Sequence, residues 1–183
     1  MPTVHTVRSL RIALAGGDTL ADLFADRPLL LLLPRTERRV PTGRVSRYGD
    51  TERDKTGTSK GPTGAFALLS NAETQVIPVQ KSDRNPFSAL FTIGRSSTND
   101  LVIKLDSVSK VHCFLSETKG EWFAQDNGSS NGIVIESESI KHREKVPISP
   151  GTSLWVGRQE LVFMDQASLL ALLEIVSKRQ ATE

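Results

Sequence analysis

The amino-acid sequence predicts an all-β fold, a β-sandwich, for the middle and later part of the chain. Apolar runs at residues 101–103, 111–115 and 122–124 are short and rich in β-prone side chains. Each run is bounded by clusters of Asn, Asp, Ser or Gly, which are typical of turns. Short strands that recur regularly with turn signals favour a sandwich over a parallel α/β sheet.

The expected strands follow one another through the domain, and the first two form a pair around a turn at Asn71. In chain order the strands cover residues 65–70, 74–80, 90–93, 101–103, 111–116, 122–126, 133–135 and 139–140. Polar loops join them, and functional side chains are expected in those loops.

The loops contain one permanently charged group, Arg95, among many hydroxyls and amides. These neighbours are Ser96, Ser97, Thr98, Ser107, Ser109, Lys110, Ser129, Ser130 and Asn131. A guanidinium has donors only, so together with hydroxyls and loop N–H groups it matches a phosphate or a carboxylate. The alternative is that these are turn residues on a solvated rim, because Ser, Asn and Gly occur in every turn.

Four motifs in register carry a resemblance to a known family. They are Gly94-Arg95, Asn99-Asp100, Ser109-Lys110-Val111-His112 and Gly128-Ser129-Ser130-Asn131-Gly132. Their order and spacing resemble the forkhead-associated (FHA) domain. The resemblance extends over residues 64–165, including strand-like residues 65–69 and 74–78 and the closing residues 146–157. It implies a sandwich of two twisted, mainly antiparallel sheets whose loops bind phosphothreonine peptides.

The resemblance also implies a role for each matching residue. Arg95 corresponds to the arginine that grips the phosphate, and Ser109 to the hydroxyl that hydrogen-bonds it. Lys110 is at a position that contacts phosphate or peptide, and Ser130 and Asn131 match the pair whose second member holds the ligand's main chain. The residues expected to shape the loops are Gly94, His112 and Gly132. One departure is Ile133, which stands where the family usually has Thr.

The 183 residues allow one domain with extensions, and the charge is uneven along the chain. Residues 1–64 contain 11 Lys and Arg against 7 Asp and Glu, whereas residues 65–183 contain 12 against 14. The expected division is an N-terminal extension at 1–33, a basic and polar linker at 34–63, the FHA domain at 64–165 and a C-terminal helix at 166–183.

The N-terminal extension combines a short amphipathic pattern with a run of five leucines. Leu20, Leu23 and Phe24 have helical spacing, with Asp18 available as the cap. Residues 29–33 are expected to form a short strand or helical turn packed on the sandwich. The segment is interpreted as a structural appendage, with a docking element for another protein as the alternative.

Residues 34–63 have the composition of a flexible linker, because they contain too few apolar side chains to offset the entropy of ordering. Five arginines lie at 35–47, but no aromatic residues are interleaved with them, so a solvated tether is favoured over nucleic-acid binding. Thr51, Thr56 and Thr58 are candidates for phosphorylation. If phosphorylated, they could bind the chain's own domain and make it a self-inhibited switch.

The C-terminal residues change from a strand period to a helical one. The apolar stripe is formed by Leu169, Leu170, Leu172, Leu173 and Val176. Lys178 and Arg179 suit the negative pole of the helix. Packing on the sandwich is favoured over a dimerisation or partner surface.

No enzymatic or cofactor site is expected. The three histidines are scattered, no phosphate-binding loop motif occurs, and the single cysteine, Cys113, lies in an apolar run as a buried hydrophobe. No metal site is expected either. No export signal is visible and the leucine run is far shorter than a membrane span, so the sequence predicts a soluble cytoplasmic protein.

The function predicted from these features is a phosphothreonine-binding adaptor for partners marked by a Ser/Thr kinase, the partner being the kinase or its substrate. Two alternatives stay open. One is a phosphate-independent scaffold that docks a partner through a sheet face or the tail helix. The other is a nucleic-acid-linked adaptor that uses the arginines of 35–47, whose affinity would fall steeply with salt.

Overall fold

The computed structural model describes residues 4–34, 63–140 and 142–180. The expected linker therefore lies almost entirely outside the described residues, as do its arginines and Thr51, Thr56 and Thr58.

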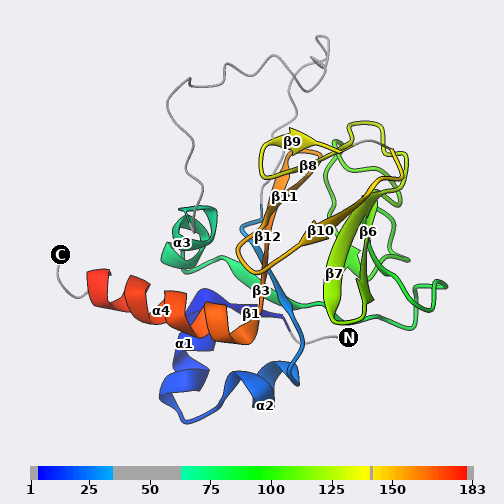
Figure 1. Cartoon of the computed structure of the whole chain (residues 1–183). Coiled ribbons are helices and arrows are strands. Elements are labelled where there is room, and N and C mark those ends of the chain that lie inside the picture. Colours follow the sequence, from blue (N-terminus) through cyan, green and yellow to red (C-terminus); the bar gives the residue numbers. More distant parts are fainter. Residues whose placement is uncertain (1–3, 35–62, 141, 181–183) are drawn as a thin grey trace, which may run out of the picture.

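The described residues form two β-sheets and four helices (Figure 1). The seven-stranded sheet contains, in spatial order, β1 (His5–Thr6), β3 (Gln75–Pro78), β2 (Leu29–Leu32), β12 (Gln159–Met164), β11 (Ser153–Val156), β8 (Ile133–Ile135) and β9 (Glu138–Ser139). The five-stranded sheet contains β10 (Lys145–Ile148), β7 (Glu121–Asp126), β6 (Cys113–Thr118), β4 (Phe91–Gly94) and β5 (Leu101–Val102). All neighbouring strands are antiparallel except β4 and β5, which are parallel. The predicted all-β sandwich fold is confirmed.

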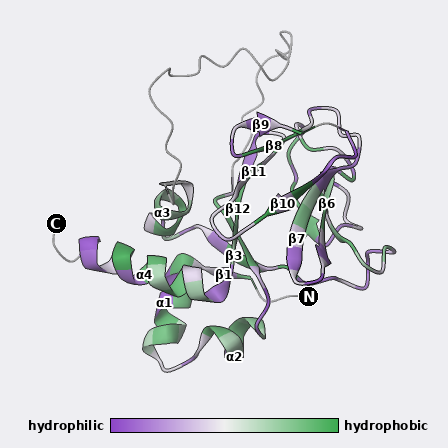
Figure 2. Ribbon diagram, viewed as in Figure 1, coloured by the Kyte–Doolittle hydropathy of each residue, from purple (hydrophilic) through white to green (hydrophobic). Residues whose placement is uncertain are grey.

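Two apolar cores lie on the two faces of the seven-stranded sheet. The first is between the sheets and includes Leu115, Leu154 and Ile93. The second lies between the seven-stranded sheet and α1 (Val7–Ala15), α2 (Leu20–Phe24), α3 (Thr63–Ser70) and α4 (Gln166–Gln180). Figure 2 shows apolar residues along these helices. The molecule thus has a helical layer on one side of its sandwich.

The leucine run forms β2, a central strand of the sandwich. Leu30 and Leu32 enter the core between the sheets, and Leu29 and Leu31 enter the core under the helices. β2 pairs with β12 on one side and β3 on the other. A strand covered on both faces has no polar alternation, which explains the unbroken apolar run. The expected appendage therefore supplies an internal strand of the sheet.

The prediction of a strand at 65–70 is wrong, because these residues form helix α3. Ala65, Leu68 and Leu69 are buried at helical spacing in the second core. The two positions beside β3 that such a strand could take are filled by β1 and β2. The second member of the expected pair is confirmed as β3.

The two short N-terminal helices are separated at Gly16 and Gly17. Leu20 and Phe24 of α2 are buried, as their spacing predicts. The cap of α2 is Thr19 rather than the expected Asp18, because the Thr19 side chain accepts a hydrogen bond from the Asp22 N–H and the Asp22 carboxylate accepts one from the Thr19 N–H.

The C-terminal helix α4 packs on the helical side of the sheet. Leu169, Leu173 and Val176 are buried, whereas Leu170 remains exposed. Packing thus accounts for most of the predicted apolar stripe. Among residues 4–34, 63–140 and 142–180, the structure has no helix long and apolar enough to cross a membrane.

Candidate functional site

Three loops and one tight turn meet at one end of the sandwich. The loops are residues 95–100, 103–112 and 127–132, and the turn between β11 and β12 is at 157–158. Hydrogen bonds join the second loop to each of the other segments. The structure therefore brings together the motifs that are dispersed over about forty residues of sequence.

Arg95 lies directly after β4 with its side chain at the surface. The Arg95 N–H donates to the Ser109 carbonyl at 2.8 Å, and the Nε–H donates to the Val108 carbonyl at 3.1 Å. These bonds orient the guanidinium. Its Nη1 lies 4.0 Å from a carboxylate oxygen of Asp106, which is 94% exposed, so this ion pair is weak.

Gly94 allows the first two loops to approach each other closely. A Cβ atom at this position would collide with the carbonyl oxygen of Lys110 and lie 2.9 Å from the Cα of Val111. Beside it, the buried Asn99 amide donates to the carbonyls of Ser96 and Lys110, at 2.8 and 2.7 Å. This packing fixes the backbone that carries Arg95.

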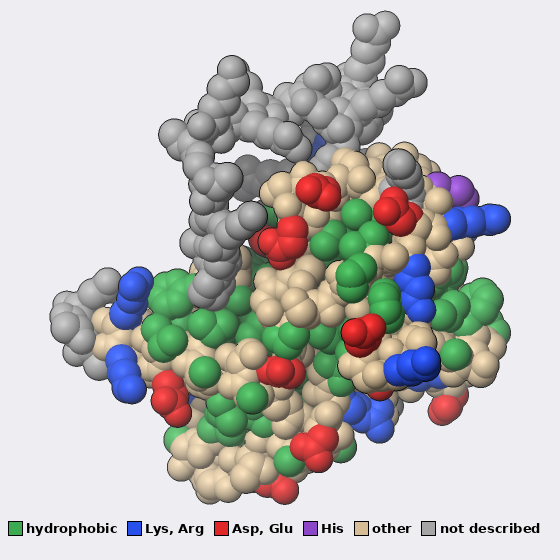
Figure 3. Space-filling model, in the orientation of Figure 1, with side chains coloured by type: hydrophobic (Ala, Val, Ile, Leu, Met, Phe, Trp, Pro, Cys, Tyr) green, Lys and Arg blue, Asp and Glu red, His purple; other side chains and the backbone are tan. Residues whose placement is uncertain are grey.

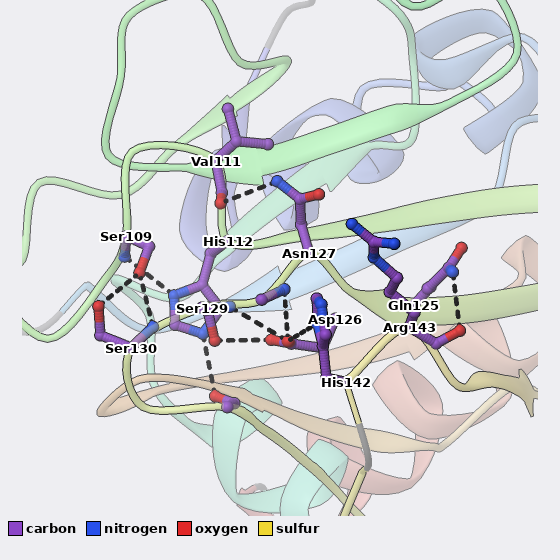
Figure 4. A network of polar contacts seen from close by, with 12 residues as sticks. Ser109, Val111, His112, Gln125, Asp126, Asn127, Ser129, Ser130, His142 and Arg143 are labelled. Atoms are coloured by element: carbon purple, nitrogen blue, oxygen red, sulfur yellow. Dashed lines mark hydrogen bonds and ion pairs between the residues drawn. The ribbon is translucent and has the colours of Figure 1, made fainter.

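Ser109 and Asn131 connect the second and third loops. The Ser109 hydroxyl oxygen accepts from the Ser130 N–H at 3.0 Å and lies 3.5 Å from the Ser130 hydroxyl (Figure 4). The Asn131 amide donates to the Ser107 carbonyl at 2.7 Å. Ser130 and Asn131 are exposed, so both loops present polar groups to solvent around the Ser109 hydroxyl.

His112 is buried beneath these loops and supports both of them. Its Nδ1 accepts from the Ser109 N–H at 3.0 Å, so the neutral ring carries its proton on Nε2, which lies 3.0 Å from the Gly132 carbonyl oxygen. Burial lowers the pKa of His112, against the opposing effects of the Gly132 carbonyl and the Asp126 charge. Gly132 has a φ of 69°, a conformation that glycine adopts without strain.

Asp126 organises the start of the third loop. Its carboxylate accepts from the N–H groups of Gly128 and Ser129, at 2.7 and 3.1 Å, and from the Ser129 hydroxyl at 2.6 Å. His142 lies 3.5 Å from the same carboxylate (Figure 4). A buried carboxylate that accepts this many hydrogen bonds holds the loop in one conformation.

Lys110 lies in the second loop, and Cys113 and Ile133 begin the strands β6 and β8 that follow the second and third loops. Lys110 has an exposed side chain, while its carbonyl accepts the bonds from Asn99 and from the Ser96 N–H. Ile133, the departure from the family pattern, is buried in the core between the sheets. Cys113 is also buried there, and burial raises the pKa of its thiol.

Sequence reasoning missed the contribution of the β11–β12 turn. The Arg158 N–H donates to the Ser107 hydroxyl at 3.2 Å, and a Cβ at Gly157 would collide with the Ser107 carbonyl. Arg158 is exposed and adds a cation to the rim of the site. The signal was a Gly-Arg pair at the end of the closing residues 146–157, but its proximity to residue 107 requires the sheet topology.

The site contains exposed cations and hydroxyl and amide donors, which suit an anion. Within the ranges that the structure describes, no group of three or more His, Cys, Asp or Glu side chains could hold a metal ion.

Comparisons with known proteins show what this part of the chain is similar to. Residues 91–157 match the family model of the FHA domain. FhaB of Mycobacterium tuberculosis, an FHA domain-containing protein, is 35% identical over 66 residues, which are 36% of this chain and 41% of FhaB. The chain therefore spans less than half the length of this relative. These findings identify residues 91–157 of the chain as similar to FHA domains.

Solved structures similar to the chain include an FHA domain and a phosphopeptide complex. The FHA domain of CT664 from Chlamydia trachomatis is 16% identical with a TM-score of 0.46, and the match covers 76% of this chain and 97% of that one. Mycobacterium tuberculosis EmbR, solved in complex with a low-affinity phosphopeptide, is 28% identical with a TM-score of 0.40. That match covers 43% of this chain and 20% of EmbR.

Proposed function

We propose that the chain binds phosphothreonine peptides through the loop end of its sandwich and acts as an adaptor in Ser/Thr-kinase signalling. The observation that carries the proposal is the exposed Arg95 guanidinium, oriented by its bond to the Val108 carbonyl and adjacent in the fold to Ser109. The match of residues 91–157 to the FHA family supports the same site.

The chemistry of the loops fits a phosphate monoester. A phosphothreonine carries about −1.5 to −2 charges and three strong acceptor oxygens. The terminal nitrogens of Arg95, one of which makes only a weak ion pair with the exposed Asp106, can donate to the phosphate, and the Ser109 hydroxyl and the exposed Lys110 ammonium offer further donors. Two or three charge-assisted hydrogen bonds of about 1.5–3 kcal/mol each would account for much of the roughly −8 kcal/mol of micromolar binding.

The remaining residues of the site would position the peptide. Asn131 is already hydrogen-bonded to Ser107, so its amide is held in place before a ligand arrives. A side chain ordered in advance loses little entropy on binding, which favours affinity. We assign to Asn131 the role of holding the ligand's main chain, and we place Ser130 at the rim of the phosphate site. Gly94, His112 and Gly132 would maintain the conformation of the loops.

The partner in this proposal is a phosphothreonine-containing protein, either a Ser/Thr kinase or its substrate. The chain's own Thr51, Thr56 and Thr58 are candidate ligands of the same class. In support, the Leu33 carbonyl accepts a hydrogen bond from the Gln159 side chain at 3.0 Å, and Gln159 directly follows the β11–β12 turn. Leu33 precedes the last described residue of this segment, so the segment ends at the end of the sandwich that holds the site.

Calorimetric titration of the full chain tests the proposal. The ligands are a degenerate phosphothreonine peptide library, its unphosphorylated form and its phosphoserine form, and the variants are Arg95→Ala and, as a matched control, Arg8→Ala. Arg8 is 67% exposed and pairs with Glu73 in the helical region. We expect micromolar binding that requires the phosphate and Arg95 but not Arg8.

Binding that persists after phosphatase treatment would favour the alternative function, a phosphate-independent scaffold. Absence of binding by the folded chain would refute the proposed function. The phosphoserine library measures whether the threonine methyl group is recognised.

A further inference from the structure

A second concave site lies at the other end of the sandwich from the phosphate-binding loops. It has a cavity volume of about 680 Å³, within the usual range for ligand sites. β7 begins at this cavity with Glu121 and ends at Asp126, where the 127–132 loop starts. Six strand residues span about 17–20 Å, so the two sites are separate.

The floor of the cavity is aromatic. Trp122 and Phe163 line it with ring centroids 5.7 Å apart and planes inclined at 41°. Phe163 is buried, whereas Trp122 is only partly buried. The walls add Pro28, Pro147 and Pro150. Aromatic floors of this kind bind proline-rich segments, which are already extended and lose little entropy on docking.

The rim of the cavity is mainly acidic. Asp26, Glu121 and Asp165 line it, against a single basic residue, Arg27. In Figure 3, the surface between the start of α4 and the β7 strand shows hydrophobic and acidic side chains, with Lys or Arg side chains beside them toward β7. A ligand with basic residues beside an apolar segment complements this distribution.

The cavity depends on segments outside the FHA match. Pro28 lies before β2, and Phe163 and Asp165 follow residue 157, where the match ends. Gln166 at the start of α4 fixes one wall, because its amide oxygen, in the orientation that satisfies its hydrogen bonds, accepts from the N–H groups of Asp26 and Arg27 at 3.1 and 3.3 Å. This wall is thus built from both ends of the described chain.

We propose that this cavity, lined by Trp122, Phe163 and three prolines under an acidic rim, is a docking site for a proline-rich peptide with basic flanking residues. Such a site would let the chain hold two partners at once, one at each end of the sandwich. The acidic rim selects for the flanking basic residues, and the aromatic floor accepts the proline rings.

The test uses the full chain with Trp155→Phe, which leaves Trp122 as the only tryptophan and its fluorescence as the readout. The probe is the blocked octapeptide RPLPPLPR, and the matched probe is EPLPPLPE. We expect saturable, sub-millimolar binding of the basic probe and binding of the acidic probe at least about fivefold weaker, since each exposed charge pair contributes up to about fivefold.

Two variants locate the binding. Ser149→Arg places a bulky cation at the cavity, and it should weaken binding of the basic probe more than about tenfold, whereas Ser139→Arg on β9 should not. The double variant Asp26→Asn with Glu121→Gln removes two rim charges and should weaken binding about threefold or more. Asn tolerates the φ of 54° at position 26.

Absence of saturable binding, or equal affinity of the Ser149→Arg variant, would overturn the proposal. Sedimentation would reveal a second copy as the occupant: a dimer that Ser149→Arg dissociates would also overturn it. Arg95→Ala should leave binding of the basic probe unchanged. The outcome is therefore independent of the proposed phosphopeptide function.

Discussion

Replacing Leu31 with alanine tests whether the leucine run is an internal strand. Leu31 is fully buried in the second core, and its register partners are Val76 on β3 and Val162 on β12. Leu→Ala substitutions at such sites cost about 2.7–5 kcal/mol, because the lost transfer free energy is joined by the energy of a cavity. Since whole domains are stable by about 5–15 kcal/mol, this change is severe.

Urea denaturation followed by circular dichroism measures the effect. With an m-value of about 2 kcal/mol/M, a loss of about 3–5 kcal/mol lowers the unfolding midpoint by about 1.5–2.5 M. The control is Leu170→Ala on α4, because Leu170 is 41% exposed and should lose about 1 kcal/mol or less.

The same reasoning predicts that a fragment beginning at residue 64 does not fold, because it lacks β2 and leaves β3 and β12 without their shared neighbour. If Leu31→Ala were no more destabilising than Leu170→Ala, or if the fragment unfolded cooperatively with the stability of the full chain, the assignment of β2 to the core would be refuted.

Three further predictions concern the loop site. Burial lowers the pKa of His112 in the folded chain, so just below about pH 6.5 only the unfolded chain binds this proton. Urea titrations should therefore show the full free energy of unfolding above pH 7, and a loss of up to about 1.4 kcal/mol per pH unit as the pH falls from 6.5 towards the folded-state pKa. The variant His112→Gln should lack this pH dependence. Gly94→Ala should lower stability by about 1–3 kcal/mol and weaken phosphopeptide binding, because its Cβ collides with the Lys110 carbonyl; unchanged calorimetric affinity would contradict the close approach. Asp126→Ala should lower the free energy of unfolding, measured with urea, by about 2–4 kcal/mol, since it leaves the donors of Gly128 and Ser129 unpaired. Increased amide hydrogen exchange confined to residues 127–132 should accompany this loss.

Some features of this protein could be predicted because their signals are local. The turn clusters and apolar runs mark most strands, and the spacing of Leu169, Leu173 and Val176 marks α4. The loop motif around Arg95 and Ser109 indicates an anion site, because donor chemistry is a property of the residue types themselves.

Other predictions went wrong where a local pattern suits two structures. Residues 65–70 are apolar and are expected as a strand, yet they form α3, because β1 and β2 occupy the two places beside β3. The leucines at 29–33 show neither a strand-like nor a helical alternation of apolar and polar residues, since a strand buried on both faces needs no polar positions.

Periodicity and the chemistry of neighbouring residues are enough to predict the sandwich class, the C-terminal helix and the candidate phosphate-binding residues. The folded chain is needed to see that β2 lies between β3 and β12, that the Arg158 N–H bonds Ser107, and that Trp122 and Phe163 line a cavity with Pro28. The reason is that these contacts join residues far apart in the chain, where no local propensity specifies the partner.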